Sequence, residues 1–340
     1  MIWLTWRQFR TQAVFGLALV VAVAAVYLAT RSTLLDIARD TGYTACTADC
    51  EQLASQFVKT ARSGYLGKLY QIAALVLLLF PAVVGLFWGA PLVARELEAG
   101  THRLVWNQSI SRNRWLGVKL GGIGLATAAV AGLASWAITA WASPLDKVDG
   151  WVTPLTYAAR GIVPIGYAVL AFVAGVTLGM LLRRTVMAMA LTLLVIVGAM
   201  VGGLFLREQL VAHSTYQAPL AGDWDGGISL SPDDPNHEIR LEVEPPAIAT
   251  WVLDNKVITS TGAVYRGPYD PDYCGPKATK GGDGPRGCRD WLTAQNLHQK
   301  VTYIGNDKFW ALQWRETGVL LVASSLLAIF CFWWIRRRVA

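Results

Sequence analysis

The 340-residue sequence has little charge: Asp, Glu, Lys and Arg make up only 16% of it, whereas hydrophobic residues make up 54%. A soluble domain usually carries about 25% charged residues. The deficit is concentrated in long runs without any charge, which excludes an ordinary water-soluble domain. The net charge of +7 could indicate nucleic-acid binding, but its distribution along the chain argues otherwise, and we expect no nucleic-acid partner.

Signatures of catalysis are also missing. The four histidines are scattered, and no H-E-x-x-H metal motif, G-x-S-x-G nucleophile elbow or G-x-x-x-x-G-K-[ST] phosphate loop occurs. A chain that hydrolysed ATP with its own residues would need the phosphate loop. We therefore expect no catalytic residue, no metal site and no cofactor on this chain.

Six charge-free runs are long enough to span a bilayer as helices, which takes about 20 apolar residues. They are residues 11–30, 69–94, 120–145, 161–182, 185–206 and 317–335. None alternates in segments of about ten residues, as a membrane β-barrel would. The sequence predicts an all-α polytopic membrane protein with six transmembrane helices. Because no charged residue lies inside these runs, a carrier driven by protons or sodium is disfavoured.

The basic residues indicate the orientation. If six spans alternate, most clusters of Lys and Arg fall on one side, which carries a net charge of +10 against −3 on the other. This is the asymmetry of the positive-inside rule, so we predict that both termini are cytoplasmic in a bacterial plasma membrane. The clusters are Arg7 with Arg10, the segment 95–119, Arg183 with Arg184, and residues 336–338.

This topology divides the chain into residues 1–206 with the first five helices, an extracytoplasmic domain at 207–316, and a last helix with a basic tail at 317–340. Residues 31–68 form a modest outer loop. The insert at 207–316 holds strand-like runs and a helix-like stretch, so we predict a mixed α/β or irregular fold for it. The strand-like runs are 237–253 and 256–265, and the helix-like stretch is 289–299.

Four of the five cysteines fall on the predicted outside: Cys46, Cys50, Cys274 and Cys288. An even number in an oxidising space indicates disulfides, and four cysteines allow three pairings. Pairing of neighbours, Cys46 with Cys50 and Cys274 with Cys288, is the simplest. Cross-pairing would tie the first loop to the insert, and free thiols or a metal site are further alternatives.

Proline and glycine occur within the predicted spans. Glycines spaced i, i+4 let helices approach closely, and kinks at proline can serve as hinges. The pattern fits either close packing alone or movement between states. The prolines are Pro81, Pro91 and Pro164, and the glycine pairs are Gly117/Gly121, Gly175/Gly179 and Gly198/Gly202.

The polar segment 95–119 separates the second and third spans on the predicted cytoplasmic side. Its start continues the second span as a helix, Gly100 stops that helix, and Thr101 is positioned to cap a short helix through Trp106. Ser109 or Ser111 can cap the turn that leads into the third span. This pattern predicts a short helix across the membrane face that serves as a docking surface, and a solvated positive loop is the alternative.

This segment, GAPLVARELEAGTHRLVWNQSISRNRWLGVKL, resembles the cytoplasmic segment of type-2 ATP-binding-cassette (ABC) permeases, with its E-x-E-x-G-T pattern, short helix, Pro-Val-Ser-Arg-like turn and Lys. Ser109 and Ile110 replace the usual Pro-Val. The terminal stretches WLTWRQFR, FWALQWRETG and FWWIRRR are similar to the actinobacterial branch of that family. The matching positions are Glu96, Glu98, Gly100, Thr101, Ser111, Arg112 and Lys119. The resemblance does not extend to residues 207–308.

The resemblance implies a partner and a mechanism. Such permeases pair with two copies of a separate ATP-binding subunit, which holds ATP and Mg²⁺, and with a second permease subunit, for which we expect a homodimer rather than a heterodimer. Substrate moves along the interface between the permeases. The implied ATPase-coupling residues are Arg95, Glu96, Glu98, Gly100, Thr101, Arg103, Trp106 and Arg112, and an interfacial elbow helix at 2–10 would carry Trp3, Trp6, Arg7 and Arg10.

The elbow has a plainer alternative, since aromatic and basic residues also form an ordinary interfacial belt at the start of a span. For the whole chain we expect export of a hydrophobic or amphipathic substrate. The first alternative is a subunit that transmits mechanical work to an extracytoplasmic partner through the insert without carrying substrate. The second is a membrane enzyme with its site in the insert.

Overall fold

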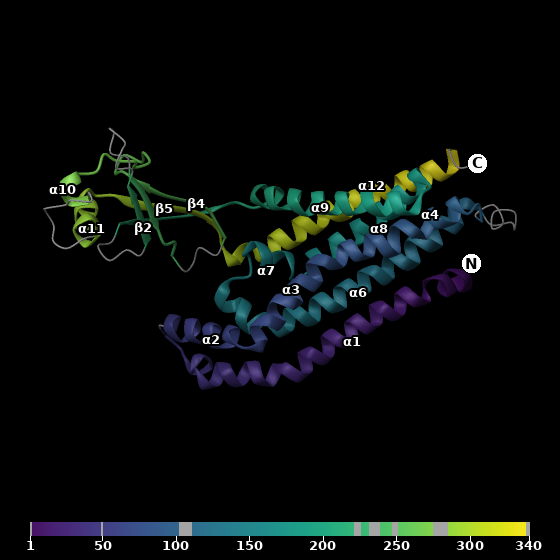
Figure 1. Cartoon of the computed structure of the whole chain (residues 1–340), viewed down its shortest axis with the longest axis horizontal. Coiled ribbons are helices and arrows are strands. Elements are labelled where there is room, and N and C mark those ends of the chain that lie inside the picture. Colours follow the sequence, from purple (N-terminus) through teal and green to yellow (C-terminus); the bar gives the residue numbers. More distant parts are fainter. Residues whose placement is uncertain are drawn as a thin grey trace. The chain divides into compact units, whose positions relative to one another are not determined.

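The structure, a computed structural model, describes residues 2–48, 50–101, 111–220, 226–230, 239–246, 251–274 and 285–337. The chain forms two compact units, Met1–Leu210 with Phe309–Ala340, and Val211–Lys308 (Figure 1). Within the described residues, six helices are long and apolar enough to cross a membrane, which confirms the predicted number. They are Phe9–Asp40, Tyr65–Glu98, Arg112–Asp149, Val163–Leu182, Thr185–Leu210 and Asn306–Arg337.

The described part of the first unit is helical. Its elements are α1 (Ile2–Asp40), η1 (Tyr43–Ala45), α2 (Glu51–Ser63), α3 (Tyr65–Val84), the π-helical η2 (Gly85–Gly89), α4 (Ala90–Glu98), α6 (Arg112–Asp149), α7 (Pro154–Ala158), α8 (Val163–Leu182), α9 (Thr185–Leu210) and α12 (Phe309–Arg337).

Helix α8 is the centre of this unit. It packs against α3, η2, α4, α6, α9 and α12, and it runs through the middle of the bundle in Figure 1. Its sequence is apolar on every side, which is the pattern of a helix enclosed by other helices. The largest core cluster forms along it, with Phe172 and Val176 against Val84, Trp115 and Ile123.

Several helices extend beyond the predicted apolar runs. Helix α6 begins at Arg112 and ends at Asp149, and α12 begins at Phe309. Charged residues therefore lie inside these helices and are buried, so the expectation of spans without charge was wrong. The predicted spans were ended at the first charged residue of each apolar run. A charged residue can nevertheless be buried inside a helix when a neighbouring helix supplies its partner. In the described helices α6, α9 and α12 the buried charged residues are Lys119, Asp146, Arg207 and Glu316, and Arg160, which precedes α8, is buried as well.

Residues 31–68 are largely helical rather than a plain loop. Helix α1 continues to Asp40, and α2 follows after the short η1. The apolar face of α2, including Phe57 and Ala61, packs against Leu34 of α1 and Trp141 of α6. Burial of this face explains the difference, because an amphipathic helix becomes stable when its apolar stripe finds a partner.

Helix α1 is continuous from Ile2 to Asp40. The expected separate elbow helix at 2–10 is thus the beginning of the first long helix. No proline or glycine occurs before Gly16, so nothing in the sequence interrupts the helical hydrogen bonds. The placement of residues 2–10 at a membrane interface, as an elbow or as a belt, stays a prediction.

The helix of the second span is interrupted near its two prolines, as the sequence predicts. Pro81 lies inside α3, the π turn of η2 follows, and Pro91 lies in the first turn of α4. Proline has no N–H to donate to the preceding turn, and the wide turn accommodates the interruption, with the N–H of Ala90 donating to the carbonyl of Gly85.

The second unit is a mixed α/β domain, as predicted. A three-stranded antiparallel sheet has the order β1-β5-β4, and β2 pairs with β3 in a second sheet. Its elements are β1 (Ser214–Pro219), β2 (Gly226–Leu230), β3 (Ile239–Val243), β4 (Trp251–Ile258), α10 (Pro271–Cys274), α11 (Pro285–Ala294), β5 (His298–Ile304) and η3 (Asn306–Lys308).

The predicted helix at 289–299 is only partly confirmed. Helix α11 ends at Ala294, and the chain enters β5 at His298 after Asn296, which has a positive φ of 53°. The turn lets Leu297 and Val301 be buried while β5 pairs with both β1 and β4. Residues 298–304 form a strand because they pair with a strand on each side. The spacing of apolar residues in the sequence does not show this pairing.

Candidate functional site

One end of the first unit gathers the start of α1, the end of α4, the starts of α6 and α9 and the end of α12 (Figure 1). The described ends of the polar segment, 95–101 and 111–119, therefore lie at the same end as both terminal helices. Arg336 Nε donates to Asn113 Oδ1 at 3.0 Å, which links the end of α12 to the start of α6. The basic clusters predicted to share one side do share one end of the bundle.

The described part of the segment confirms the predicted helix stop. Gly100 has a φ of 71°, a conformation that favours glycine, and its N–H donates to the carbonyl of Leu97 at 3.3 Å. The hydroxyl of Thr101 donates back to the carbonyl of Glu96 at 3.4 Å. Ser111 is the N-cap of α6. Residues 102–110 lie outside the described residues, and they hold the predicted short helix after Thr101, with Arg103 and Trp106, and the alternative cap Ser109.

Glu98 joins the end of α4 to the start of α9. Its Oε2 accepts hydrogen bonds from the backbone N–H of Thr185 at 3.1 Å and from the Thr185 hydroxyl at 2.8 Å. A carboxylate in this position satisfies an unpaired N–H of the first turn and interacts favourably with the helix dipole. These hydrogen bonds link the end of α4 to the first turn of α9.

Glu96 joins α4 to α6 in a similar way. Its Oε1 lies 2.6 Å from Nζ of Lys119, which is only 3% exposed. The ammonium also donates to the carbonyl of Leu92 at 3.3 Å and lies 4.7 Å from the ring centroid of Trp115. This buried cation is held by a carboxylate, a carbonyl and an aromatic face, so it fixes α6 against the second span.

Glycine allows η2 and α4 to contact α8 backbone to backbone. A Cβ added to Gly89 would lie 2.5 Å from the carbonyl oxygen of Phe172. One added to Gly175 would lie 2.6 Å from the carbonyl oxygen of Gly85, and one added to Gly179 would lie 2.5 Å from that of Ala90. The close approach predicted for Gly175/Gly179 is confirmed.

The other two glycine pairs do not pack in this way. A Cβ on Gly121, Gly198 or Gly202 would meet nothing within 4 Å, and one on Gly117 would meet only Phe332 at 3.8 Å. Of the three predicted glycine pairs, only Gly175/Gly179 of α8 makes close backbone contact within the first unit. Helices α8 and α4 with η2 form one tightly packed body that ends at segment 95–119.

The opposite end of the unit holds buried ion pairs. Arg207 near the end of α9 makes a bidentate pair with Glu316 of α12, with Nε–Oε2 at 2.9 Å and Nη2–Oε1 at 3.0 Å. The hydroxyl of Tyr167 on α8 donates to the same carboxylate at 2.8 Å, and the guanidinium lies 4.9 Å from the ring centroid of Tyr157. Burial, followed by the Glu316 charge, raises the pKa of Tyr157, so its phenol stays neutral.

A second pair lies at the same end. Arg160 Nε donates to Asp146 Oδ2 at 2.7 Å, both side chains are fully buried, and the Tyr70 hydroxyl donates to Asp146 Oδ1 at 2.5 Å. Gln313 of α12 connects the two pairs, since its amide nitrogen donates to the carbonyls of Tyr157 and Arg160. Its Oε1 accepts from the backbone N–H groups of Ile162 and Val163 at the start of α8.

Sequence reasoning missed this buried polar layer, which consists of Tyr70, Asp146, Tyr157, Arg160, Tyr167, Arg207, Gln313 and Glu316. Its charges were treated as the solvent boundaries of the spans. A signal was present, because the third and fourth spans are bounded on the same side by Asp146 and Arg160, and the last two by Arg207 and Glu316. Opposite charges at neighbouring helix ends on one side can form pairs.

Comparison with known proteins identifies the bundle. Residues 17–207, more than half of the chain, match the family model described as ABC-2 membrane transporter related. The chain belongs to this family. The match begins within α1, includes segment 95–119, and ends within α9, before the second unit. Neither the curated proteins nor the solved structures gave a match.

Membership in the ABC-2 family, together with six apolar helices, fits the permease subunit of an ABC transporter and implies an ATP-binding partner subunit. Of the remaining residues expected at the site, Arg95 is exposed beside a cavity of about 200 Å³ that also contacts Phe9 and Trp88, and Arg112 is the first residue of α6.

At the start of α1, Arg7 and Arg10 are exposed, and Phe9 between them is buried with its ring centroid 5.2 Å from that of Trp88. The side chains of Trp3 and Trp6 lie outside the described part. The first turns of α1 are therefore held against η2 by aromatic packing, close to the segment that separates the second and third spans.

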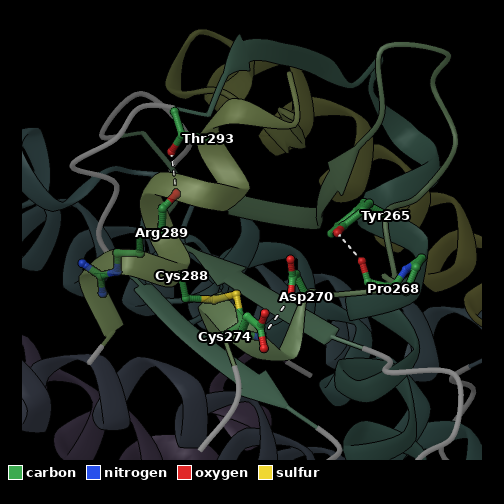
Figure 2. Close-up of a disulfide and its surroundings, with 8 residues drawn as sticks. Tyr265, Pro268, Asp270, Cys274, Cys288, Arg289 and Thr293 are labelled. Carbon is green, nitrogen blue, oxygen red and sulfur yellow. Dashed lines mark hydrogen bonds between the residues drawn. A yellow bond between two sulfur atoms is a disulfide. The ribbon is translucent and has the colours of Figure 1, made fainter. Parts of the chain in front are cut away.

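The cysteines form the local pairs, Cys46–Cys50 and Cys274–Cys288, and Cys331 is free and buried. Figure 2 shows the second disulfide joining α10 to α11, with Asp270 at the start of α10. Within the residues that the structure describes, no cluster of three or more His, Cys, Asp or Glu residues could hold a metal ion.

Proposed function

We propose that this chain is the permease subunit of an ABC exporter, moved by a separate ATP-binding subunit that docks on segment 95–119. ATP and Mg²⁺ bind on that partner, and the cargo is a hydrophobic or amphipathic molecule. The observation that carries the proposal is the family match over residues 17–207, because it includes both the helices and the segment between the second and third spans.

The contacts at the ends of segment 95–119 support a role in coupling. A docked partner would push on α4, and Glu98 connects α4 to α9 while Glu96 connects it to α6. The glycine contacts join α4 and η2 to α8 without side chains between them. Because packed elements shift between discrete arrangements rather than deforming continuously, a displacement at this end is passed to three spans at once.

The charge distribution supports a bacterial plasma membrane with segment 95–119 and both termini in the cytoplasm. The second unit, Val211–Lys308, is then extracytoplasmic, where disulfides such as Cys274–Cys288 are stable.

A second copy of the permease is the expected partner within the membrane. Helix α9 leaves Gly198 and Gly202 exposed with open space above them, flanked by the exposed apolar side chains of Leu194 and Val201. Small residues of this spacing allow another helix to approach closely in a bilayer. We propose that α9 contributes to a homodimer interface along which the cargo moves.

The coupling role is tested with tagged protein purified from its native membrane. We expect a nucleotide-binding ATPase to co-purify, and we expect its ATPase rate to depend on the permease. Glu98→Gln should abolish this dependence while membrane insertion is unchanged. Glu51→Gln, at an exposed position on α2, is the matched control. The absence of any ATPase from the purified complex would overturn the proposal.

The second unit favours one alternative function, in which the subunit transmits mechanical work to an extracytoplasmic partner without carrying cargo. Val211–Lys308 has its own core, with Leu292, Leu297 and Val257 buried, so it is more than a connecting loop. An envelope protein that co-purifies with the full chain, but not when residues 211–308 are replaced by a short linker, would support this alternative. Stimulation of the ATPase by cargo would support export.

A further inference from the structure

A large groove lies in the first unit at the end opposite segment 95–119. Its volume is about 910 Å³, within the range of about 300–1,000 Å³ that is typical of sites for small molecules. One wall is a single face of α3 from Gly67 to Leu78, and the others come from the ends of α2 and α6 and from α7.

The groove is polar at one end and apolar at the other. Arg62 and Asp149 form an ion pair at the polar end, and Tyr70 and Gln71 of α3 lie beside them. One to two turns further along α3 the wall becomes apolar with Ala74, Leu75 and Leu78, opposite Leu155 of α7. A molecule that fits this gradient has a polar head and an apolar body.

The apolar end continues into a second cavity of about 270 Å³ between α3, α7, α8 and α9. The two cavities share Leu78, Pro154 and Leu155, and the second extends to Pro81. At about 1.5 Å per residue, α3 rises roughly 21 Å from Gly67 to Pro81. This length suits one long chain but is shorter than the hydrocarbon core of about 30 Å.

The head end offers hydrogen-bond donors. A guanidinium has five N–H groups in a planar fork that matches carboxylate or phosphate oxygens. In the part of the chain that the structure describes, Arg62 uses one of these groups for Asp149 and lies 5.4 Å from the ring centroid of Tyr70. Its side chain is 45% exposed, against 20% for Asp149, so the cation is the more accessible member of the pair.

We infer that this groove binds a single-chain amphiphile with an anionic head, the head at Arg62 and the chain along α3 past Leu78 toward Pro81. The inference uses the membrane placement of the proposed function but not its ATP coupling. The amphiphile can be a lipid of the surrounding bilayer or the exported cargo, since a carboxylate or phosphate on one long chain is common to both.

The test uses the full chain in nanodiscs with a diazirine-bearing palmitate as the probe and a diazirine-bearing hexadecanol as its neutral match. We expect the palmitate to label peptides containing residues 67–81 or 149–156, and the alcohol to bind about tenfold more weakly, because it lacks the charge that pairs with the guanidinium. Photolabelling at increasing probe concentration gives the apparent Kd.

Variants separate the two ends of the site. Arg62→Gln should raise the Kd for palmitate about tenfold, whereas Asp149→Asn, which leaves the guanidinium in place, should not weaken binding. Leu78→Trp fills the junction of the two cavities and should abolish labelling near Pro81. Leu79→Trp is the control, since that side chain is exposed and lines neither cavity.

Equal labelling by the acid and the alcohol, an unchanged Kd in Arg62→Gln, or labelling confined to the outer face of α9 would each overturn the inference. Protection of the groove by a second copy of the chain, seen as labelling in the monomer that disappears in the dimer, would also overturn it. With the ATPase bound, labelling that falls on ATP hydrolysis identifies cargo, and labelling that persists identifies a resident lipid. Both results support the groove, and neither depends on the coupling residues.

Discussion

The buried pair Arg207–Glu316 offers a prediction whose size follows from the structure. The two side chains are 2% and 1% exposed, and the carboxylate also accepts from Tyr167. Arg207→Met leaves a buried carboxylate without its cation, which typically costs about 3–5 kcal/mol. At about 2–4 °C per kcal/mol for domains of 150–250 residues, the expected fall in Tm is roughly 6–20 °C.

The double variant Arg207→Met/Glu316→Gln removes both charges and keeps an oxygen for Tyr167. Because replacing a whole buried pair is often close to neutral, we expect most of the lost Tm to return. Arg39→Met is the control, since its pair with Asp36 is exposed and surface pairs contribute about 0–1 kcal/mol. The assay is thermal unfolding in nanodiscs by tryptophan fluorescence. A double variant that loses as much as or more than Arg207→Met would refute the reasoning.

Three further predictions concern packing and covalent structure. Gly179→Ala should lower the free energy of unfolding of the first unit by about 1–3 kcal/mol through overpacking, measured by urea unfolding, whereas Gly121→Ala on α6 should be tolerated because its Cβ meets open space. Replacing Cys274 and Cys288 by serine should destabilise the second unit by about 3 kcal/mol, since a chain separation of 14 residues is closed, and limited proteolysis should detect it. Ser111→Ala should cost about 1 kcal/mol by removing the cap of α6.

A different result would contradict each of these three predictions. Equal effects of the two glycine substitutions would contradict the backbone contact with α4. Unchanged proteolysis of the second unit without its disulfide would mean that the apolar core alone holds α10 against α11. An unchanged stability of the Ser111 variant would show that the first turn of α6 is fixed by tertiary packing instead.

The number of spans could be predicted because each has a run of apolar residues long enough to cross a bilayer, and no partner is needed to recognise it. The helix stop at Gly100 could also be predicted without knowledge of any partner, because it depends on a local backbone preference of glycine. The layer around Asp146 and Glu316 could not, because its burial depends on cations that come from other helices. The fold of residues 31–68 also depends on distant partners, such as Trp141 for the apolar face of α2.

Within the second unit, the helix predicted from Arg289 agrees with α11 at its start. The prediction continued to residue 299, whereas α11 ends at Ala294. The strand that follows depends on pairing with β1 and β4. Val301 pairs with Tyr216, 85 residues earlier, and Gln299 pairs with Val257, 42 residues earlier. These partners meet only after the chain has folded back. Local preference identifies an element and rarely its end.

The central claim, that a separate ATPase docks on segment 95–119, is tested most directly by site-specific photo-cross-linking in native membranes. A photoreactive amino acid at the exposed Thr101 is compared with one at the exposed Arg39 near the end of α1. The account predicts a cross-link from position 101 to a nucleotide-binding ATPase and none from position 39. A cross-link to the ATPase from position 39, or its absence from position 101 in a complex that contains the ATPase, would contradict the account.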